Sequence, residues 1–523
     1  MAETSPGHLA VRQRMAALRT GAAGRLLSWR LGFALVLLLG AALRFHGLGW
    51  DQPPEADYPL QMHPDERFLS LVADRLDWPS SLSAYFDTAR SPLNPYNDGQ
   101  TNSYVYGTFP LFLVKAVATL RGADPAGPGN SYAATVVSGR QVTAAFDVLA
   151  ILLVFLLAAA LAGRRIGLLA ALLYALAVLP TQLAHFWAMD PFLNVFALLT
   201  LLLSVHWVRA EGSRAWWLAA GIGVSVGLAT ACKVNGAIFA AIPVVAFALR
   251  ILLWDIRRAR ASWNGERPPA RPGSSWLSDL SMLCMAGALS LIVFRIAQPY
   301  AFAGPHPWDF ALNQQWWDDI QRERDFQQGN VDYPPFIQFA GTTPFLTALR
   351  NITLWGLGPA LATAAFAGLA AAAVRAARTR DLALVLPAVF AILVLAFWGP
   401  RFVAFMRYFL PMYPVLCLFA AWALVFLRRV GPHRLVVPHP PPRAPPRAAP
   451  RPHRSLRRFR TRRGRNRVVG VRLPAHLRRG APPHRRHALG LRKRPAREVD
   501  NHRNLGRPRP LGFPRPRTPV PPC

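Results

Sequence analysis

The sequence has few cysteines and few acidic residues. Its four cysteines, spread over 523 residues, show no spacing typical of a metal site or a disulfide framework. There are 26 acidic residues against 60 lysines and arginines, which gives a net charge of +34. From Arg428 to the end the sequence has 28 basic and 2 acidic residues, so this tail carries +26 and the rest only +8. The main part of the chain is therefore mildly basic, and no nucleic-acid partner is expected.

Long apolar stretches dominate the rest of the chain. Hydrophobic residues make up 52% of it, and the mean hydropathy is +0.21. Several runs of about 17–22 apolar residues are long enough to cross a bilayer. The sequence therefore predicts an all-α polytopic membrane protein with about ten spans. The predicted spans lie near residues 31–45, 141–162, 166–186, 191–208, 215–232, 236–254, 277–298, 354–374, 382–398 and 408–427.

The distribution of arginines sets the predicted orientation in the membrane. A basic N-terminus places the start of the chain in the cytoplasm, and turn arginines such as Arg164 and Arg209 then also fall inside. Counting the apolar segment 104–120 as a span would reverse this, so we interpret it as a helix lying in the outer interface. With this count Asp65 and Asp190 share the outer face.

An adjacent pair of acids follows the first predicted span. Segment 61–68 reads Gln-Met-His-Pro-Asp-Glu-Arg-Phe, and its acids are Asp65 and Glu66. A proline before the pair fixes the local backbone, and a short amphipathic helix is expected after it. Carboxylates also suit the positive end of a helix dipole. A solvated helix start and a functional site are therefore both consistent with this segment alone.

Further charged residues lie on the predicted outer rim. Asp190 precedes Pro191 between two apolar helices, where it is either a helix cap or a functional acid, because a charge facing lipid is costly. Arg401, Arg407 and Lys233 lie on the side that the positive-inside tendency disfavours, which indicates an anionic partner. Snorkelling to lipid phosphates is the alternative.

The second long outer loop is rich in aromatic residues. Residues 298–351 include Trp316, Trp317 and six acids, together with a Gly-Asn-Val-Asp-Tyr-Pro-Pro run that is incompatible with regular helix. Aromatic residues here are consistent with an interface belt or with the lining of a sugar or lipid groove.

These outer features together fit glycosyl transfer from a lipid-phosphate sugar. A phosphate is already a good leaving group, so this reaction differs from hydrolysis of a simple glycoside, where a paired acid is normally required. One carboxylate can deprotonate the acceptor hydroxyl, and cations can stabilise the charge that develops on the phosphate. The lipid tail would stay in the bilayer while the sugar phosphate enters an outer cavity.

The order of these motifs resembles that of the GT-C glycosyltransferases. It is most similar to the protein O-mannosyltransferase-like, phospholipid carrier-dependent branch, which is glycosyltransferase family 39 with its aminoarabinose-transferase relatives. The resemblance covers roughly residues 30–427. It rests on His-Pro-Asp-Glu at 63–66, Gly-Arg-Gln at 139–141, His-Phe-Trp-Ala-Met-Asp at 185–190 and Arg-Tyr-Phe-Leu-Pro-Met-Tyr-Pro at 407–414. The family's Lys-Pro-Pro near the second interfacial helix is replaced here by Thr-Phe-Pro at 108–110.

The resemblance implies a role for each motif in an inverting transferase. Asp65 would be the general base, with Glu66 supporting it, and Asp190 would orient the base or help to hold a cation. The implied donor-phosphate ligands are Arg407, Lys233, Arg401 and Tyr408. The implied substrate groove consists of His63, Tyr106, His185, Trp316 and Trp317. No cofactor is firmly implied and no residue is assigned to a metal, although paired carboxylates also suit a divalent ion.

The expected partners are a polyprenyl-phosphate sugar, an acceptor protein, lipid or glycan, and the bilayer, with the protein in the inner membrane of a prokaryote. The alternative function is a transporter or a flippase for lipid-linked sugars. Transporters place their charges near the middle of the membrane, often within repeats. In this sequence the charges gather at one rim and no repeat is evident.

The predicted organisation has three parts. A cytoplasmic segment, 1–30, precedes a transmembrane catalytic domain, 31–427, whose outer loops span about 46–140 and 299–353. An Arg/Pro-rich tail, 428–523, cannot build a packed core. Three interpretations of this tail stay open: a cytoplasmic arm that binds anionic lipid or nucleic acid, a plain disordered tail, and an out-of-frame translation of a GC-rich gene.

Overall fold

The computed structural model describes residues 22–55, 59–122, 130–265, 276–379, 382 and 384–430. Over these residues the chain is helical and contains no strand beyond an isolated antiparallel bridge between Phe302 and Leu312. The predicted all-α fold class is confirmed. Most of the predicted N-terminal segment and nearly all of the Arg/Pro-rich tail lie outside the described residues.

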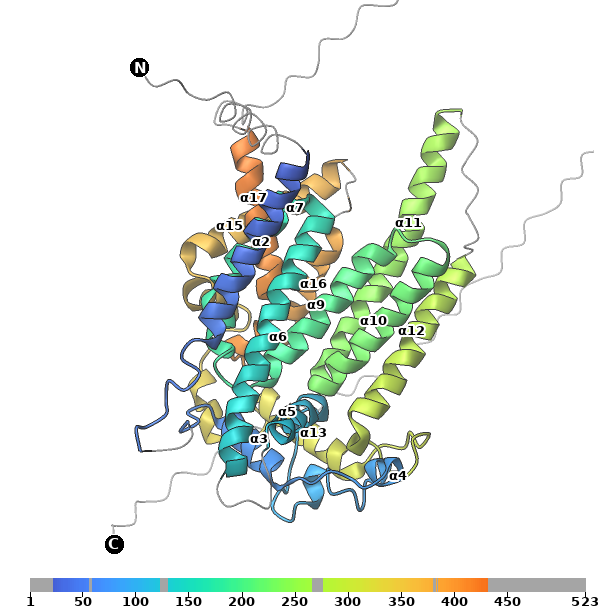
Figure 1. Ribbon diagram of the computed structural model, residues 1–523. Helices are drawn as coiled ribbons and strands as arrows, with labels where there is room; N and C mark the ends of the chain where they lie inside the picture. Colours follow the sequence, from blue (N-terminus) through green and yellow to red (C-terminus); the bar gives the residue numbers. More distant parts are fainter. Residues whose placement is uncertain are drawn as a thin grey trace, which may run out of the picture. The chain divides into compact units, whose positions relative to one another are not determined.

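Long helices run side by side through the fold, and shorter ones gather at one of its ends (Figure 1). The long helices and their close partners are α2 (Ala22–Phe45), α6 (Asn130–Ala162), α7 (Arg164–Ala175), α8 (Val178–Leu183), α9 (Met189–Trp207), α10 (Gly212–Cys232), α11 (Ala241–Trp263), α12 (Trp276–Ala297), α15 (Pro359–Thr379), α16 (Val385–Trp398) and α17 (Met412–Val430). The shorter helices are α3 (Pro64–Arg75), α4 (Leu82–Phe86), α5 (Thr108–Leu120), α13 (Gln314–Gln328) and α14 (Leu346–Asn351). Short helical turns complete the path at Pro95–Asn97, Val234–Ala240, Pro299–Ala301, Pro334–Phe339, Ile352–Gly356 and Met406–Phe409.

Six helical segments among the described residues are long and apolar enough to cross a membrane. They are Tyr132–Ala162, Met189–Trp207, Gly212–Cys232, Val234–Trp263, Trp276–Ala297 and Pro359–Arg378. Shorter apolar helices occur at Thr108–Leu120, Val385–Trp398 and Met412–Phe426. The chain is therefore a multi-pass membrane protein. Each predicted span overlaps a helix, but the count of about ten is not confirmed.

The third predicted span is broken into two helices. α7 ends at Ala175, and α8 begins three residues later, at Val178. The cause is Pro180, because a proline has no N–H for the carbonyl four residues earlier and its ring clashes with that carbonyl. The position four residues before Pro180 is Leu176, where α7 has its C-terminal cap.

A buried arginine donates hydrogen bonds to two carbonyl groups beside this break. Arg44, at the end of α2, donates from Nη1 to the carbonyl of Ala175 at 2.8 Å and from Nη2 to that of Tyr174 at 3.4 Å. Its Nε pairs with Asp147 of α6 at 2.5 Å, and both side chains are fully buried. The Tyr174 hydroxyl donates to the other oxygen of Asp147 at 2.6 Å and accepts from Asn194 of α9. This network joins four helices at one level of the bundle.

Two small residues allow α10 and α12 to approach closely. A Cβ at Gly223 would collide with the Ala286 carbonyl oxygen, and one at Gly227 would lie 2.7 Å from that of Ser290. The spacing of four residues puts both glycines on one face of α10, an arrangement typical of tightly packed membrane helices.

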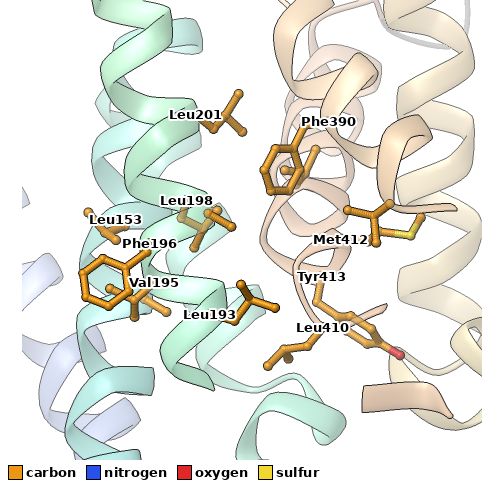
Figure 2. Close-up of a cluster of buried hydrophobic side chains, with 14 of the residues drawn as sticks. Leu153, Leu193, Val195, Phe196, Leu198, Leu201, Phe390, Leu410, Met412 and Tyr413 are labelled. Carbon is orange, nitrogen blue, oxygen red and sulfur yellow. The ribbon is translucent and has the colours of Figure 1, made fainter. Parts of the chain in front are cut away.

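The hydrophobic core brings α9 against the last two helices. Figure 2 shows side chains of α9, such as Leu193, Leu198 and Leu201, on one side, and Phe390 of α16 and Tyr413 of α17 on the other. All five are buried. Burying apolar side chains of this size contributes roughly 1.5–3 kcal/mol each. This packing fixes the start of α9, which carries Asp190, relative to the turn before α17, which carries Arg407.

The two loops that were predicted to lie on the outer face meet at one end of the bundle, where α3, α4, α5 and α13 lie together (Figure 1). The predicted interfacial segment forms α5, which begins at Thr108. The Thr108 hydroxyl donates to the Ala297 carbonyl at the end of α12, at 2.7 Å. The Gly107 amide donates to the Cys232 carbonyl at the end of α10, at 3.2 Å. These contacts place the start of α5 beside Lys233.

Candidate functional site

The acidic motif forms the first turn of α3, where its two carboxylates point in different directions. His63 is the N-cap residue, Pro64 opens the helix, and Asp65 and Glu66 follow. Successive residues of an α-helix are rotated by about 100°, so neighbours do not share a face. Glu66 is fully buried, whereas the Asp65 side chain keeps 17% of its surface exposed. The two acids therefore have separate roles.

Glu66 holds Arg140 of α6 in a buried cluster. Arg140 donates to both carboxylate oxygens of Glu66, at 2.7 and 2.8 Å, and to both of Asp51, at 2.7 and 3.0 Å. Such two-pronged pairs are the strong form of the arginine–carboxylate contact. Glu66 also accepts the backbone amide of Trp187 at 3.0 Å. Its contacts are thus with the scaffold, and the support predicted for Asp65 acts through the position of α3.

The Trp187 ring reaches this cluster because residue 139 is a glycine. A Cβ at Gly139 would lie 2.7 Å from ring atoms of Trp187, too close for any side chain. Trp187 is fully buried and stands three residues before Asp190. Gly139 and Arg140 of α6 therefore fix the segment that leads into α9 and its acid.

Asp65 forms an ion pair with an arginine that lies far from it in the sequence, Arg407. Arg407 Nη1 lies 2.7 Å from Asp65 Oδ2, and both side chains are partly exposed. The same Nη1 lies 2.9 Å from His63 Nε2. A guanidinium nitrogen can only donate, so His63 accepts with the unprotonated Nε2. Arg407 thus joins the acidic motif to the predicted Arg-Tyr motif, 342 residues further along the chain.

A second pair lies beside the first. Lys233 Nζ is 3.1 Å from Asp190 Oδ1, and Asp190 is nearly buried at the start of α9. The same ammonium lies 4.3 Å from the centre of the Tyr408 ring. The Arg407 guanidinium lies 5.6 Å from that ring, so Tyr408 contacts both cations. A cation over an aromatic ring is attracted by the electrons of the ring face. The role implied for Asp190, to orient the base or to help to hold a cation, stays a prediction.

The charges near Asp65 oppose the effect of burial on its pKa. Burial raises the pKa of Asp65, but Arg407, His63 and Lys233 together hold it below its usual value. Burial lowers the pKa of His63 despite the nearby acids, so the imidazole is neutral at pH 7. Burial and the charge of Asp65 raise the pKa of Tyr106, which stays a protonated hydrogen-bond donor. The site therefore holds an ionised carboxylate, two cations and a neutral donor.

Two residues of α13 that the sequence did not indicate also face this site. The Gln327 amide donates to the Tyr408 hydroxyl at 3.0 Å and to Glu323 Oε1 at 2.6 Å. Burial raises the pKa of Glu323, and the charge of Asp65 raises it further. Helical spacing of Glu323 and Gln327 within the second outer loop is the signal that could have placed both on one face of a helix.

Other predicted residues lie elsewhere. His185 contacts the backbone carbonyls of Thr181 and His46, at 2.8 and 2.9 Å. Trp316 is buried in a small cluster with Ala301 and Phe302, while Trp317 is 40% exposed. Arg401 contacts the Trp398 ring, which stacks on Tyr408 with ring centres 4.4 Å apart. In the part of the chain that the structure describes, no three His, Cys, Asp or Glu side chains are arranged to hold a metal ion.

Comparisons with known proteins relate part of the chain to a family of transferases. The family model described as "Dolichyl-phosphate-mannose-protein mannosyltransferase" matches residues 95–308. This region includes Asp190 and Lys233 but neither Asp65 nor Arg407. The predicted resemblance to protein O-mannosyltransferases is supported over this part of the chain. The search of the curated proteins found no match.

Solved structures of membrane transferases show a distant likeness. The oligosaccharyltransferase AglB from Archaeoglobus fulgidus is 16% identical, with a TM-score of 0.47 over 77% of this chain and 50% of that one. ArnT from Cupriavidus metallidurans is 14% identical, with a TM-score of 0.44 over 78% and 61%. The S. cerevisiae Pmt1–Pmt2 complex is 17% identical, with a TM-score of 0.36 over 56% and 36%. The chain thus spans about half the length of the first of these.

Proposed function

We propose that the protein transfers a sugar from a polyprenyl-phosphate donor to an acceptor hydroxyl on the outer face of a prokaryotic inner membrane, with inversion at the anomeric carbon. The observation that carries the proposal is the contact of Asp65 with Arg407 beside the Lys233–Asp190 pair. It places an ionised carboxylate next to two cations at the end of a membrane bundle. The family match supports the donor class, because its description names a sugar on a polyprenyl phosphate.

The chemistry assigns one task to each charge. The acceptor oxygen attacks the anomeric carbon while its proton passes to the carboxylate of Asp65. The bond from the anomeric carbon to the phosphate oxygen breaks, and its electron pair stays on the phosphate. Arg407 and Lys233 stabilise this charge, with Tyr408 between them as the predicted third ligand. Attack from the face opposite to the leaving phosphate inverts the configuration.

Binding of the donor would also prepare the base. Without donor, the Arg407 guanidinium contacts Asp65 and helps to lower the pKa of its carboxyl group. A phosphate that attracts Arg407 would weaken this contact and make the carboxylate a stronger base. Asp65 would then act only when a donor is in place.

One observation favours the alternative of a transporter or flippase. The interruption between α7 and α8, beside the buried Arg44–Asp147 pair, resembles the broken helices of transporters. However, Arg44 already donates to the carbonyls beside the break, and each oxygen of Asp147 already accepts a hydrogen bond. The pair therefore has the contacts of a structural clamp, and the rim site is the better candidate for function.

The test is transfer of radiolabelled sugar from polyprenyl-phosphate donors in membranes that contain the full chain. We expect the Asp65→Asn variant to lose at least about 100-fold in rate, the scale of general base catalysis. Asp332→Asn, which changes an exposed acid of the second outer loop, is the matched control and should transfer normally. Equal transfer by the wild type and Asp65→Asn would refute the assignment of the base. Movement of intact lipid-linked sugar across vesicles without transfer would instead support the flippase.

A further inference from the structure

A cavity lies near the catalytic candidates, and no step of the proposed reaction is assigned to it. It has a volume of about 210 Å³ and lies among the end of α13, the segment before α14 and the turn after α16. Its lining includes Arg401, Thr343, Thr347 and Phe345. This combination of a cation, two hydroxyl groups and an aromatic ring is suited to an anionic ligand.

Arg401 enters this cavity without a counter-ion. Its Nε donates to the carbonyl of Phe397 at 3.1 Å, and its guanidinium lies 4.4 Å from the Phe397 ring centre and 5.3 Å from that of Trp398. Among the described residues no carboxylate forms an ion pair with Arg401. Burial lowers the pKa of Arg401, and the positive charge of Arg324 lowers it further. An anion in the cavity would compensate a charge that the protein leaves unpaired.

Hydroxyl groups provide the remaining donors. The Thr343 amide donates to the Thr347 hydroxyl oxygen at 3.1 Å, which orients that side chain. Within the described part of the chain, neither the Thr343 nor the Thr347 hydroxyl donates to another residue. A guanidinium fork together with hydroxyl donors matches the several acceptor oxygens of a phosphate group.

The wall of the cavity is held in a strained conformation. Phe345 has φ +60° and ψ −48°, and the only other described non-glycine residue with positive φ is Gln61, in the acidic motif of the catalytic candidates. The Phe345 amide donates to the Gly399 carbonyl at 2.8 Å, and its ring packs against Gly399. Such strain persists where the surroundings determine the conformation, often at ligand sites.

We propose that this cavity binds an anionic group of the phosphate class through the Arg401 guanidinium and the hydroxyls of Thr343 and Thr347. The inference does not depend on sugar transfer at Asp65. The group comes either from a phospholipid head at the outer surface or from a soluble phosphorylated molecule. In both cases the ligand lies next to Trp398, whose ring also stacks on Tyr408 of the first site.

The test uses the full chain in nanodiscs of phosphatidylcholine, titrated with inorganic phosphate. Binding is measured as the rise in the thermal unfolding midpoint and as the change in tryptophan fluorescence. We expect the wild type to respond and Arg401→Gln to bind phosphate at least tenfold more weakly. Arg401→Lys keeps the charge and should retain part of the response. Arg350→Gln, which changes an exposed arginine on α14, is the matched control and should respond fully.

The two sources of phosphate are separated by repeating the titration in nanodiscs with phosphatidylglycerol. If the anionic lipid competes with phosphate, and native mass spectrometry finds it retained by the wild type but not by Arg401→Gln, the ligand is a lipid headgroup. If it does not compete, the ligand is soluble. A full response by Arg401→Gln overturns the proposal. A response lost in Arg407→Gln but kept in Arg401→Gln also overturns it, since phosphate then binds at the Asp65 site.

Discussion

Asp65 and Arg407 lie 2.7 Å apart, so the carboxylate proposed as the base is paired with the cation proposed to bind the donor. A base in this state is weak, because the charge of the partner favours the ionised carboxylate and lowers its pKa. The neighbouring Lys233–Asp190 pair also joins a carboxylate to a cation that contacts the Tyr408 ring, and its acid is more buried. The site therefore contains two ion pairs that a bound phosphate could rearrange.

The first prediction concerns the pH dependence of the Arg407→Gln variant. Burial raises the pKa of Asp65 and Arg407 is the largest influence that lowers it, so removing Arg407 moves this pKa upward. A base is active when deprotonated, and the acid limb of kcat/KM should therefore shift to higher pH. The height of the profile should also fall, because a phosphate contact is lost.

The measurement is the rate of sugar transfer at low donor concentration between pH 4 and pH 8. Arg350→Gln serves as the control, because it removes an exposed arginine from α14. An acid limb that stays in place in Arg407→Gln, with only its height reduced, would show that Arg407 does not set the pKa of the base.

The second prediction separates the adjacent acids by their effects on stability. Glu66→Gln leaves Arg140 with one full carboxylate partner instead of two in a buried cluster. Breaking a buried pair typically costs about 3–5 kcal/mol, and the contact that Arg140 keeps with Asp51 should reduce this to about 2–3 kcal/mol. Asp65→Asn changes a partly exposed pair and should leave the thermal midpoint almost unchanged while transfer is lost.

Thermal unfolding in detergent, followed by intrinsic fluorescence, checks this prediction. Equal destabilisation by Glu66→Gln and Asp65→Asn would contradict the division of roles between the two acids. A loss of transfer in Glu66→Gln is expected as well, because α3 carries both residues. The stability measurement, rather than the activity, is therefore decisive.

The sequence predicts which charged residues lie at the same end of the membrane bundle, but it does not predict which of them form ion pairs. Counting spans places Asp65, Asp190, Lys233 and Arg407 at one rim, and the structure brings all of them together in two ion pairs. Which acid of the Asp65–Glu66 pair faces inward depends on the rotation of α3, which a short motif does not determine. The partner of Glu66 depends on packing between α3 and α6, and is therefore set by tertiary structure.

The break in the third predicted span has a local signal in the sequence. Pro180 lies inside the apolar run 166–186, and a proline predicts a helix end about four residues earlier. A hydropathy pattern alone does not indicate this helix break, because a proline does not interrupt an apolar run. The contact between Gln327 and Tyr408 had no such signal, since the residues are separated by 81 positions and by several helices.

The third prediction tests the buried clamp at this break by a double-mutant cycle. Arg44→Met and Asp147→Leu should each destabilise the protein by about 3–5 kcal/mol, because each leaves one buried charge without its partner. The double variant should cost much less than the sum of both, since no unpaired charge remains. Unfolding in mixed detergent micelles gives the three free energies. Additive effects would indicate that the two side chains act independently.

The last prediction concerns the contact between Gly139 and Trp187. A methyl group at position 139 would lie 2.7 Å from the Trp187 ring, so Gly139→Ala must displace the ring. The Trp187 amide donates to Glu66 at 3.0 Å, and its displacement would weaken the cluster that holds α3. We expect a lower thermal midpoint, by an amount equivalent to about 1–3 kcal/mol, as for other overpacked sites.

A second substitution distinguishes steric displacement from a general helix effect. Alanine is a better helix former than glycine, so helix propensity alone would make Gly139→Ala stabilising. If the ring is the cause, Trp187→Leu should reduce the cost of Gly139→Ala, although Trp187→Leu is itself destabilising through lost packing. A Gly139→Ala variant that is as stable as the wild type, or a cost that persists fully when Trp187 is leucine, would contradict the proposed contact. Rescue would show that α6 positions the segment leading to Asp190 by direct packing.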